Sequence, residues 1–250
     1  MPRPARNAAL ASASCLVLLS LLAAVVLASD RIEHGDAIAL HWFAQYEGSQ
    51  IGTLASIITF FAEPVPLLIV IGAAALAALR RGERLEVAAA LVTVLGANLT
   101  TQALKHALAH PRVQAILENP PDLTTFPSGH VTGAVTLVIA LAWLLPAGWR
   151  RRVGAWGSVY VLAVGISVLI LEWHFPTDVL GAILVALAWG FGVLAVYLWL
   201  RGGRPGSRVP RRDWAAGRAS GDSSVMGPAP AADGAGVRNA GAGAGLSENR

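Results

Sequence analysis

The pattern of apolar and polar positions divides the chain into six long apolar runs separated by short charged segments. The runs cover residues 8–28, 54–79, 85–104, 130–145, 153–171 and 178–200. A helix needs about 20 apolar residues to cross the ~30 Å hydrocarbon core of a bilayer, and most of the runs reach that length. Because backbone groups find no water partner in lipid, the runs are expected to be helical. The pattern therefore predicts an all-α, six-span transmembrane helical bundle.

Two of the runs depart from a simple span. The run at 54–79 is interrupted by Glu63, Pro64 and Pro66. Two interpretations of this interruption stay open: a helix break, or a glutamate that pairs inside the bundle or lines a substrate entry. The run at 130–145 is short for a span, so it must lie with little tilt or be extended by flanking residues.

Composition agrees with a membrane protein. Of 250 residues, 55% are hydrophobic and 14% are charged, and the mean hydropathy is +0.57. A soluble domain carries roughly 25% charged residues. The net charge of +4 does not indicate nucleic-acid binding, because the arginines lie at the ends of apolar runs. Cys15 is the only cysteine, which excludes an intrachain disulfide.

The distribution of basic residues predicts the orientation of the chain. In a six-span chain four basic segments fall on one side of the membrane. These segments contain Arg3 and Arg6; Arg80, Arg81 and Arg84; Arg150, Arg151 and Arg152; and Arg201, Arg204, Arg208, Arg211 and Arg212. The other side holds only Arg31, Lys105 and Arg112. The positive-inside rule therefore predicts a multi-pass protein of the cell membrane with both termini in the cytoplasm.

Three regions follow from this organisation. Residues 1–50 are expected to hold the first transmembrane helix and an extracytoplasmic loop, and residues 51–200 a transmembrane core. Residues 201–250 are rich in Gly, Ala, Ser, Pro and Arg and are expected to form a disordered cytoplasmic tail. The first run is either a signal peptide or a retained helix, and its length favours the retained helix.

Candidate catalytic and anion-binding residues gather at the predicted extracytoplasmic ends of the runs. The sequence Pro-Ser-Gly-His at 127–130 opens the fourth run, where Ser128 is a suitable N-cap. Gly129 allows close approach to the first backbone N–H groups of that helix, which attract anions. Lys105, the only lysine, and Arg112 lie on the same predicted side, and arginine binds phosphate through two donors. Taken alone, Lys105 is better explained as an interfacial side chain that reaches the lipid headgroups.

A second polar segment precedes the sixth run. His174 lies four residues before Asp178, and Pro176 suits the first turn of a helix. A carboxylate one turn away can hold one imidazole nitrogen and leave the other for nucleophilic attack. By itself this pair is also consistent with a helix-start cap.

Together these segments resemble the three motifs of the type 2 phosphatidic acid phosphatase (PAP2) family, whose fold is shared with vanadium-dependent haloperoxidases. The first motif reads KHALAHPRV at 105–113, the second PSGH at 127–130, and the third SVLILEWHFPTD at 167–178. The spacing of each motif matches the family pattern, and the resemblance covers roughly residues 50–200.

Two positions depart from the family pattern. Val113 replaces a proline of the first motif, and Val168 replaces the arginine of the third. In the family that arginine is a phosphate ligand, and a charge-assisted contact of this kind contributes about 1.5–3 kcal/mol. Glu172 adds a carboxylate close to His174 in a site expected to bind anions.

The resemblance implies a role for each motif residue. His174 is the expected nucleophile, which forms a phosphohistidine, and Asp178 orients it. His130 is the expected acid and base. The phosphoryl oxygens are expected to bind Lys105, Arg112, Ser128 and the backbone N–H of Gly129. No metal or cofactor is implied, because cations and helix amides neutralise the phosphate. The pair His106 and His110 has metal-ligand spacing but no third ligand, which favours a loop or interface interpretation.

The resemblance implies a membrane hydrolase that acts on a lipid phosphate or prenyl diphosphate at an extracytoplasmic site. Its expected partners are membrane lipids and that substrate, with no nucleic acid. A catalytically weak or inactive lipid-phosphate-binding relative is the main alternative, because of Val168. A haloperoxidase is disfavoured by the six predicted spans, and a transporter by the scarcity of ionisable residues within them. The sequence makes no prediction of the oligomeric state.

Overall fold

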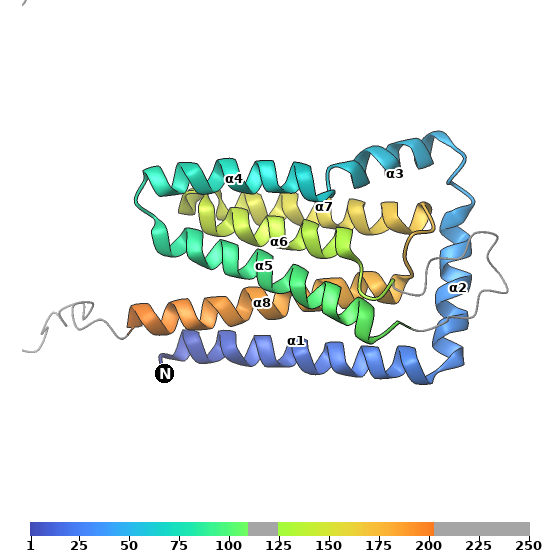
Figure 1. Ribbon diagram of the computed structural model, residues 1–250, viewed down its shortest axis with the longest axis horizontal. Coiled ribbons are helices and arrows are strands. Elements are labelled where there is room, and N and C mark those ends of the chain that lie inside the picture. The colour runs from blue at the N-terminus through green and yellow to red at the C-terminus, as the bar shows by residue number, and fades with distance from the viewer. Residues whose placement is uncertain (110–124, 203–250) are drawn as a thin grey trace, which may run out of the picture. The chain divides into compact units, whose positions relative to one another are not determined.

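A computed structural model describes residues 1–109 and 125–202 of the chain, and every described regular element is a helix (Figure 1). The elements are α1 (Arg3–Ala28), α2 (Asp30–Ala44), α3 (Gln50–Phe60), α4 (Pro64–Arg80), α5 (Arg84–Ala107), α6 (Gly129–Leu144), the 3₁₀ turn η1 (Ala147–Trp149), α7 (Arg150–Ile170) and α8 (Pro176–Gly202). The all-α prediction is confirmed for this part of the chain. Nearly all of the expected tail, from residue 203 onward, lies outside the described residues.

The number of candidate spans is four or five in the described residues, which is fewer than the six predicted. Helices α1, α5 and α8 and the segment Ala147–Ile170 are long and apolar enough to cross a membrane. Helices α3 and α4 pass the same test only as a pair, bent by 46°. Helix α6 has 16 residues, which corresponds to a length of only about 24 Å at 1.5 Å per residue. The shortfall therefore comes from the two runs that the sequence already marked as irregular.

The break between α3 and α4 follows from the prolines. Pro64 and Pro66 lack the backbone N–H that a continuous helix needs, and Pro64 instead opens α4. The break is held in place on two sides. Ala62 is 2% exposed in the core, and Tyr160 Oη of α7 donates to the Phe61 carbonyl at 3.0 Å. The helix-break interpretation of this segment is therefore correct.

The segment that was expected to be an extracytoplasmic loop contains the 15-residue helix α2 at residues 30–44, which the sequence analysis did not predict. The buried residues Glu33, Asp36, Ala37 and Leu40 follow an i, i+3, i+4, i+7 spacing, which defines one face of a helix. Two of the four are acidic, which made this stretch resemble a solvated loop. In Figure 1, α2 lies across the end of the bundle and connects α1 to α3.

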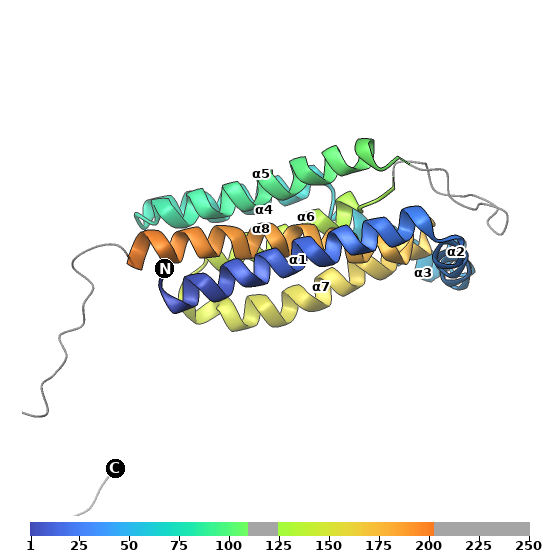
Figure 2. The same ribbon diagram turned by 90° about the horizontal axis from the view of Figure 1, so that it is seen from below.

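The long helices run side by side as a bundle, in which α6 contacts α4, α5, α7 and α8 (Figures 1 and 2). Helix α1 packs along α8, and Ser12 Oγ donates to the Ala188 carbonyl at 2.7 Å. Close contacts also require small residues, since a side chain at Gly96 would meet the ring of Trp189 at 2.5 Å. The bundle therefore holds α6, the helix that begins with the Ser-Gly-His sequence, between longer helices.

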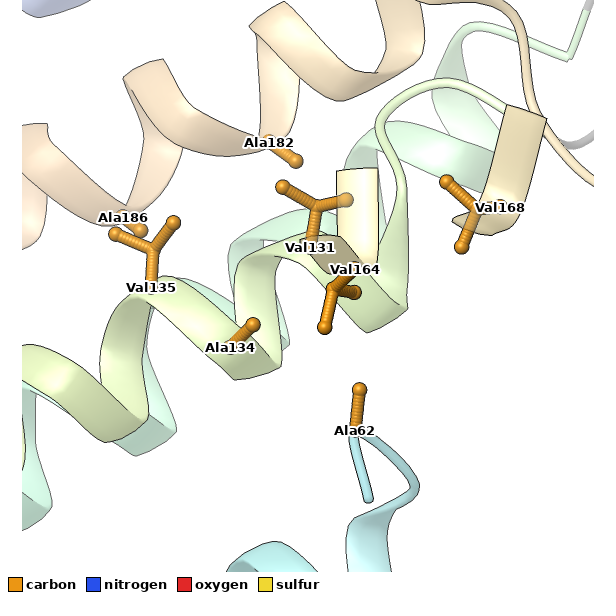
Figure 3. Close-up of a cluster of buried hydrophobic side chains, with 8 residues drawn as sticks. All are labelled: Ala62, Val131, Ala134, Val135, Val164, Val168, Ala182 and Ala186. Atoms are coloured by element: carbon orange, nitrogen blue, oxygen red, sulfur yellow. The ribbon is translucent and has the colours of Figure 1, made fainter. Parts of the chain in front are cut away.

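One hydrophobic cluster lies next to the polar end of α6. It brings together apolar side chains from the α3–α4 break and from α6, α7 and α8 (Figure 3). Its buried members are Ala62, Val131, Ala134, Val135, Val164, Val168, Ala182 and Ala186. Because Val131 directly follows His130, burial of Val131 in this cluster places His130 at the edge of the hydrophobic core.

Candidate active site

The ends of four helices meet where the sequence analysis placed the polar residues. These are the C-terminal ends of α5 and α7 and the N-terminal ends of α6 and α8, which lie at the same end of the bundle (Figure 1). Lys105, Ser128, His130, His174 and Asp178 belong to these ends or to the turns beside them. Arg112 lies in residues 110–124, outside the described part of the chain, as do His110 and Val113.

The N-terminus of α6 is capped by Ser128, as predicted. Its Oγ accepts a hydrogen bond from the Val131 N–H at 3.4 Å, and the side chain is fully buried. The Ser128 N–H donates to the Asp178 carbonyl at 3.1 Å, which ties the start of α6 to the start of α8. At Gly129, by contrast, a Cβ atom would meet nothing within 4 Å. The first turn of α6 is therefore anchored at Ser128 and open at Gly129.

A chain of hydroxyl groups sets the register between α5 and α6. Thr132 Oγ1 donates to the Ser128 carbonyl at 2.8 Å. Thr101 Oγ1 lies 3.0 Å from Thr132 Oγ1, and it is the donor because the Thr132 proton is already used. Lys105 follows Thr101 by one helical turn on the same face of α5. This register brings half-buried Lys105 near enough to His130 for their charges to interact.

His174 and Asp178 form a buried pair at the start of α8. His174 Nδ1 lies 3.5 Å from Asp178 Oδ2, and the two side chains are 7% and 0% exposed. Asp178 Oδ2 also accepts the Phe175 N–H at 2.9 Å, which fixes the carboxylate. The predicted start of α8 at Pro176 is confirmed. The pairing directs Nδ1 of His174 toward the carboxylate and leaves Nε2 as the nitrogen that can react.

The second histidine lies beside this pair. The ring centroids of His130 and His174 are 6.4 Å apart with an edge-to-face geometry, and the ring of Trp173 lies 5.2 Å from that of His130. His130 Nε2 is 3.5 Å from Glu63 Oε1. The structure thus brings two histidines from separate helix starts together, each with its own carboxylate.

The sequence analysis did not find the contacts that α2 makes to this region. Asp36 Oδ1 accepts the Thr177 N–H at 3.3 Å, and Asp36 Oδ2 accepts the Thr177 hydroxyl. Thr177 lies in the first turn of α8, where backbone N–H groups have no partner within the helix. Asp36 therefore holds the turn that carries Asp178. The i, i+3, i+4, i+7 spacing of residues 33, 36, 37 and 40 could have revealed the helix, but not the partner of Asp36.

The profile of the PAP2 superfamily matches residues 86–201, which contain all of the motif residues. This segment of the chain is similar to the PAP2 superfamily. Two proteins of Bacillus subtilis are similar to the chain. The undecaprenyl-diphosphatase BcrC (strain 168) is 36% identical over 67 residues, which are 27% of this chain and 32% of that protein. The similarity to BcrC thus spans about a third of that relative's length.

The second relative is known from a crystal structure described as the first transmembrane PAP2 type phosphatidylglycerolphosphate phosphatase from Bacillus subtilis. It superposes with a TM-score of 0.67 at 21% identity and covers 78% of this chain and 99% of that one. At this identity the superposition shows a common fold. The chain therefore combines a PAP2 match over residues 86–201, the fold of that membrane protein, and four or five candidate membrane spans in its described residues.

Val168 marks the main departure of this chain from the PAP2 motifs. Its side chain is fully buried in the hydrophobic cluster of Figure 3 and supplies no hydrogen-bond donor to the site. Four residues later Glu172 takes a left-handed backbone conformation with φ of 55°, which is uncommon for a residue other than glycine. The Trp173 N–H then donates to the Val168 carbonyl at 3.0 Å. This tight turn directs the chain from α7 back to His174.

Proposed function

We propose that this chain hydrolyses a lipid phosphate or prenyl diphosphate through a phosphohistidine at His174. The observation that carries the proposal is the convergence of the His174–Asp178 pair, His130 and the open N-terminus of α6 at one end of the bundle. The two Bacillus relatives are named for a prenyl diphosphate and a glycerolipid phosphate, which supports a lipid substrate of either kind.

In the first step His174 Nε2 attacks the phosphorus atom while Asp178 stabilises the imidazolium that forms. The bond from phosphorus to the leaving oxygen breaks, and that oxygen takes a proton from His130. Lys105 and the backbone N–H of Gly129 are placed to neutralise the phosphoryl oxygens. Ser128 holds the start of α6 in position, and the first motif assigns Arg112 to the same phosphoryl group.

In the second step His130 accepts a proton from water, which attacks the phosphohistidine. The N–P bond breaks, inorganic phosphate leaves, and His174 is restored. Both steps use the same two imidazoles, so a short separation between them is required. The ring centroids are 6.4 Å apart, so the two imidazoles lie close enough to act on the same phosphoryl group.

The proposed site faces the extracytoplasmic side, with both termini in the cytoplasm. The α4–α5 connection, the start of α7 and the end of α8 carry basic residues, and these lie at the opposite end of the bundle from His174 (Figure 1). This asymmetry fits six crossings, with α6 as a short span and α3 and α4 together as one broken span. The site then lies at headgroup level, where a lipid can enter sideways with its tail in the membrane.

A catalytically weak or binding-only relative is the second candidate function. It is favoured by one observation, namely that Val168 is buried and offers no donor where the family has an arginine. Loss of such a contact lowers transition-state stabilisation while Lys105 and the helix N-terminus still attract a phosphate. The wild-type turnover decides between the two functions.

Purified protein in detergent is expected to release inorganic phosphate from at least one member of a small lipid panel. The panel contains phosphatidic acid, phosphatidylglycerol phosphate and undecaprenyl diphosphate, and phosphate release is measured over time. Because the site neutralises a phosphoryl group but lacks an arginine ligand at position 168, we expect turnover with a lower kcat than that of a PAP2 enzyme that has the arginine. Saturable binding of the same lipids without phosphate release would instead establish the binding-only function.

A further inference from the structure

Glu63 lies at the break between α3 and α4, at the N-cap position of α4. An N-cap side chain normally accepts a backbone N–H of its own helix, but Glu63 makes no such hydrogen bond. Its Oε1 atom instead lies 3.5 Å from His130 Nε2 of α6. The carboxylate is therefore turned from its own helix toward the histidine.

The position of Glu63 is set by its neighbours. Ala62, directly before it, is buried against the cluster that contains Val131 (Figure 3). Phe61 is held through its carbonyl by the hydroxyl of Tyr160. These contacts fix the backbone from which the Glu63 side chain reaches His130.

The groups that face His130 come from three elements. Lys105 on α5 carries a positive charge and Glu63 at the α3–α4 break a negative one, while the ring of His174, before α8, lies edge-to-face with that of His130. The ring of Trp173 adds a flat surface against the imidazole. Glu63 is therefore the group at the α3–α4 break that offsets the positive charge of Lys105 and draws one ring nitrogen of His130 toward itself.

We infer that Glu63 is a positioning residue that holds His130 in the orientation and charge state needed to protonate the leaving group. The inference rests on the proposed function and deepens it. With Nε2 held toward the carboxylate, Nδ1 is left to carry the transferable proton, because the contact of one ring nitrogen sets the role of the other. As the bond from phosphorus to the leaving oxygen breaks, that oxygen takes the Nδ1 proton. The electron pair of the Nδ1–H bond stays on the imidazole.

This role predicts that the effect of Glu63 depends on the leaving group. An alkoxide is a strong base and leaves slowly unless it is protonated, whereas p-nitrophenolate leaves readily without a proton. Weakening the general acid should therefore slow the cleavage of an alkyl phosphate and spare that of p-nitrophenyl phosphate. Damage to the fold or to phosphate binding would slow both substrates alike.

The test compares the Glu63→Gln and Glu63→Asp variants with the wild type on a short-chain alkyl phosphate and on p-nitrophenyl phosphate. The parameter is kcat/KM, which reports the steps up to phosphoryl transfer to His174 and excludes the later hydrolysis. For Glu63→Gln we expect about a tenfold loss on the alkyl phosphate, as part of the contribution of a general acid, and less than about twofold on the aryl phosphate. Glu63→Asp should recover part of the loss.

Glu83→Gln is the matched control. Glu83 is also an N-cap glutamate without a capping hydrogen bond, and its carboxylate pairs with Arg81 at 2.8 Å, away from the site. The Glu63 side chain is 47% exposed, so its loss should leave the thermal midpoint nearly unchanged. Equal losses on both substrates, or no loss on either, would overturn the inference while leaving the proposed function standing. A wild type that cleaves neither these substrates nor the lipid panel would overturn both.

Discussion

The His174→Ala variant is expected to lose phosphate release by at least about a thousandfold, because the group that forms the bond to phosphorus is removed. His174 is nearly buried, and its Nδ1 atom faces the carboxylate of Asp178. Alanine leaves that carboxylate in place but provides no nucleophile. The measurement is phosphate release in detergent from whichever lipid of the panel the wild type cleaves fastest.

His41→Ala is the control for this loss, since His41 is an exposed histidine in the last turn of α2. It should retain wild-type turnover. Both variants should keep the wild-type thermal midpoint to within a few degrees, which separates loss of chemistry from loss of fold. Turnover of His174→Ala at more than about a tenth of the wild-type rate would contradict the proposed nucleophile.

The Gly129→Ala variant is expected to lose activity and gain stability at the same time. Apart from its chain neighbours and its own helix backbone, a Cβ atom at this position meets no atom of the described residues within 4 Å, so this part of the fold has room for it. Alanine also reduces the conformational freedom of the unfolded chain, which raises the free energy of unfolding by about 0.4–1 kcal/mol. The same methyl group would occupy the space in which the phosphoryl group approaches the first turn of α6. Displacement of the substrate there by about 1 Å should lower kcat/KM about a hundredfold.

Gly154→Ala is the matched control, because a Cβ atom at Gly154 on α7 also meets nothing within 4 Å. It should stabilise the protein without changing turnover. Thermal unfolding and lipid phosphate hydrolysis, measured on the same preparations, give both quantities. If Gly129→Ala retained full activity, the substrate would not contact the N-terminus of α6, and this part of the proposed site would be wrong.

Much of the fold follows from the sequence because membrane helices are marked by the length of their apolar runs. The runs around α5, α7 and α8 predicted these helices well. The sequence analysis did not predict α2, whose buried face is partly acidic. Asp36 on that face is buried because it meets the first turn of α8, a partner 141 residues away that the local pattern does not show.

The candidate site was predictable where chemistry depends on spacing along the chain. The four-residue interval between His174 and Asp178 and the capping role of Ser128 are local features, and the structure has both. The approach of Glu63 to His130 depends on the packing of the α3–α4 break against α6, so the sequence left its role open. The absence of an arginine at 168 was visible from the motif, whereas the burial of Val168 in the core was not.

Trapping of the phosphorylated enzyme tests the central claim most directly. Reaction of the His130→Ala variant with p-nitrophenyl phosphate should phosphorylate His174, since this leaving group needs no proton. The intermediate should then accumulate, because the base that activates water is missing. After alkaline quenching, which preserves phosphohistidine, peptide mass spectrometry locates the phosphate. The account predicts phosphate on His174 and none in the His130→Ala, His174→Ala double variant. Phosphate on another residue would contradict it, as would a wild-type enzyme that turns over while residue 174 is never phosphorylated.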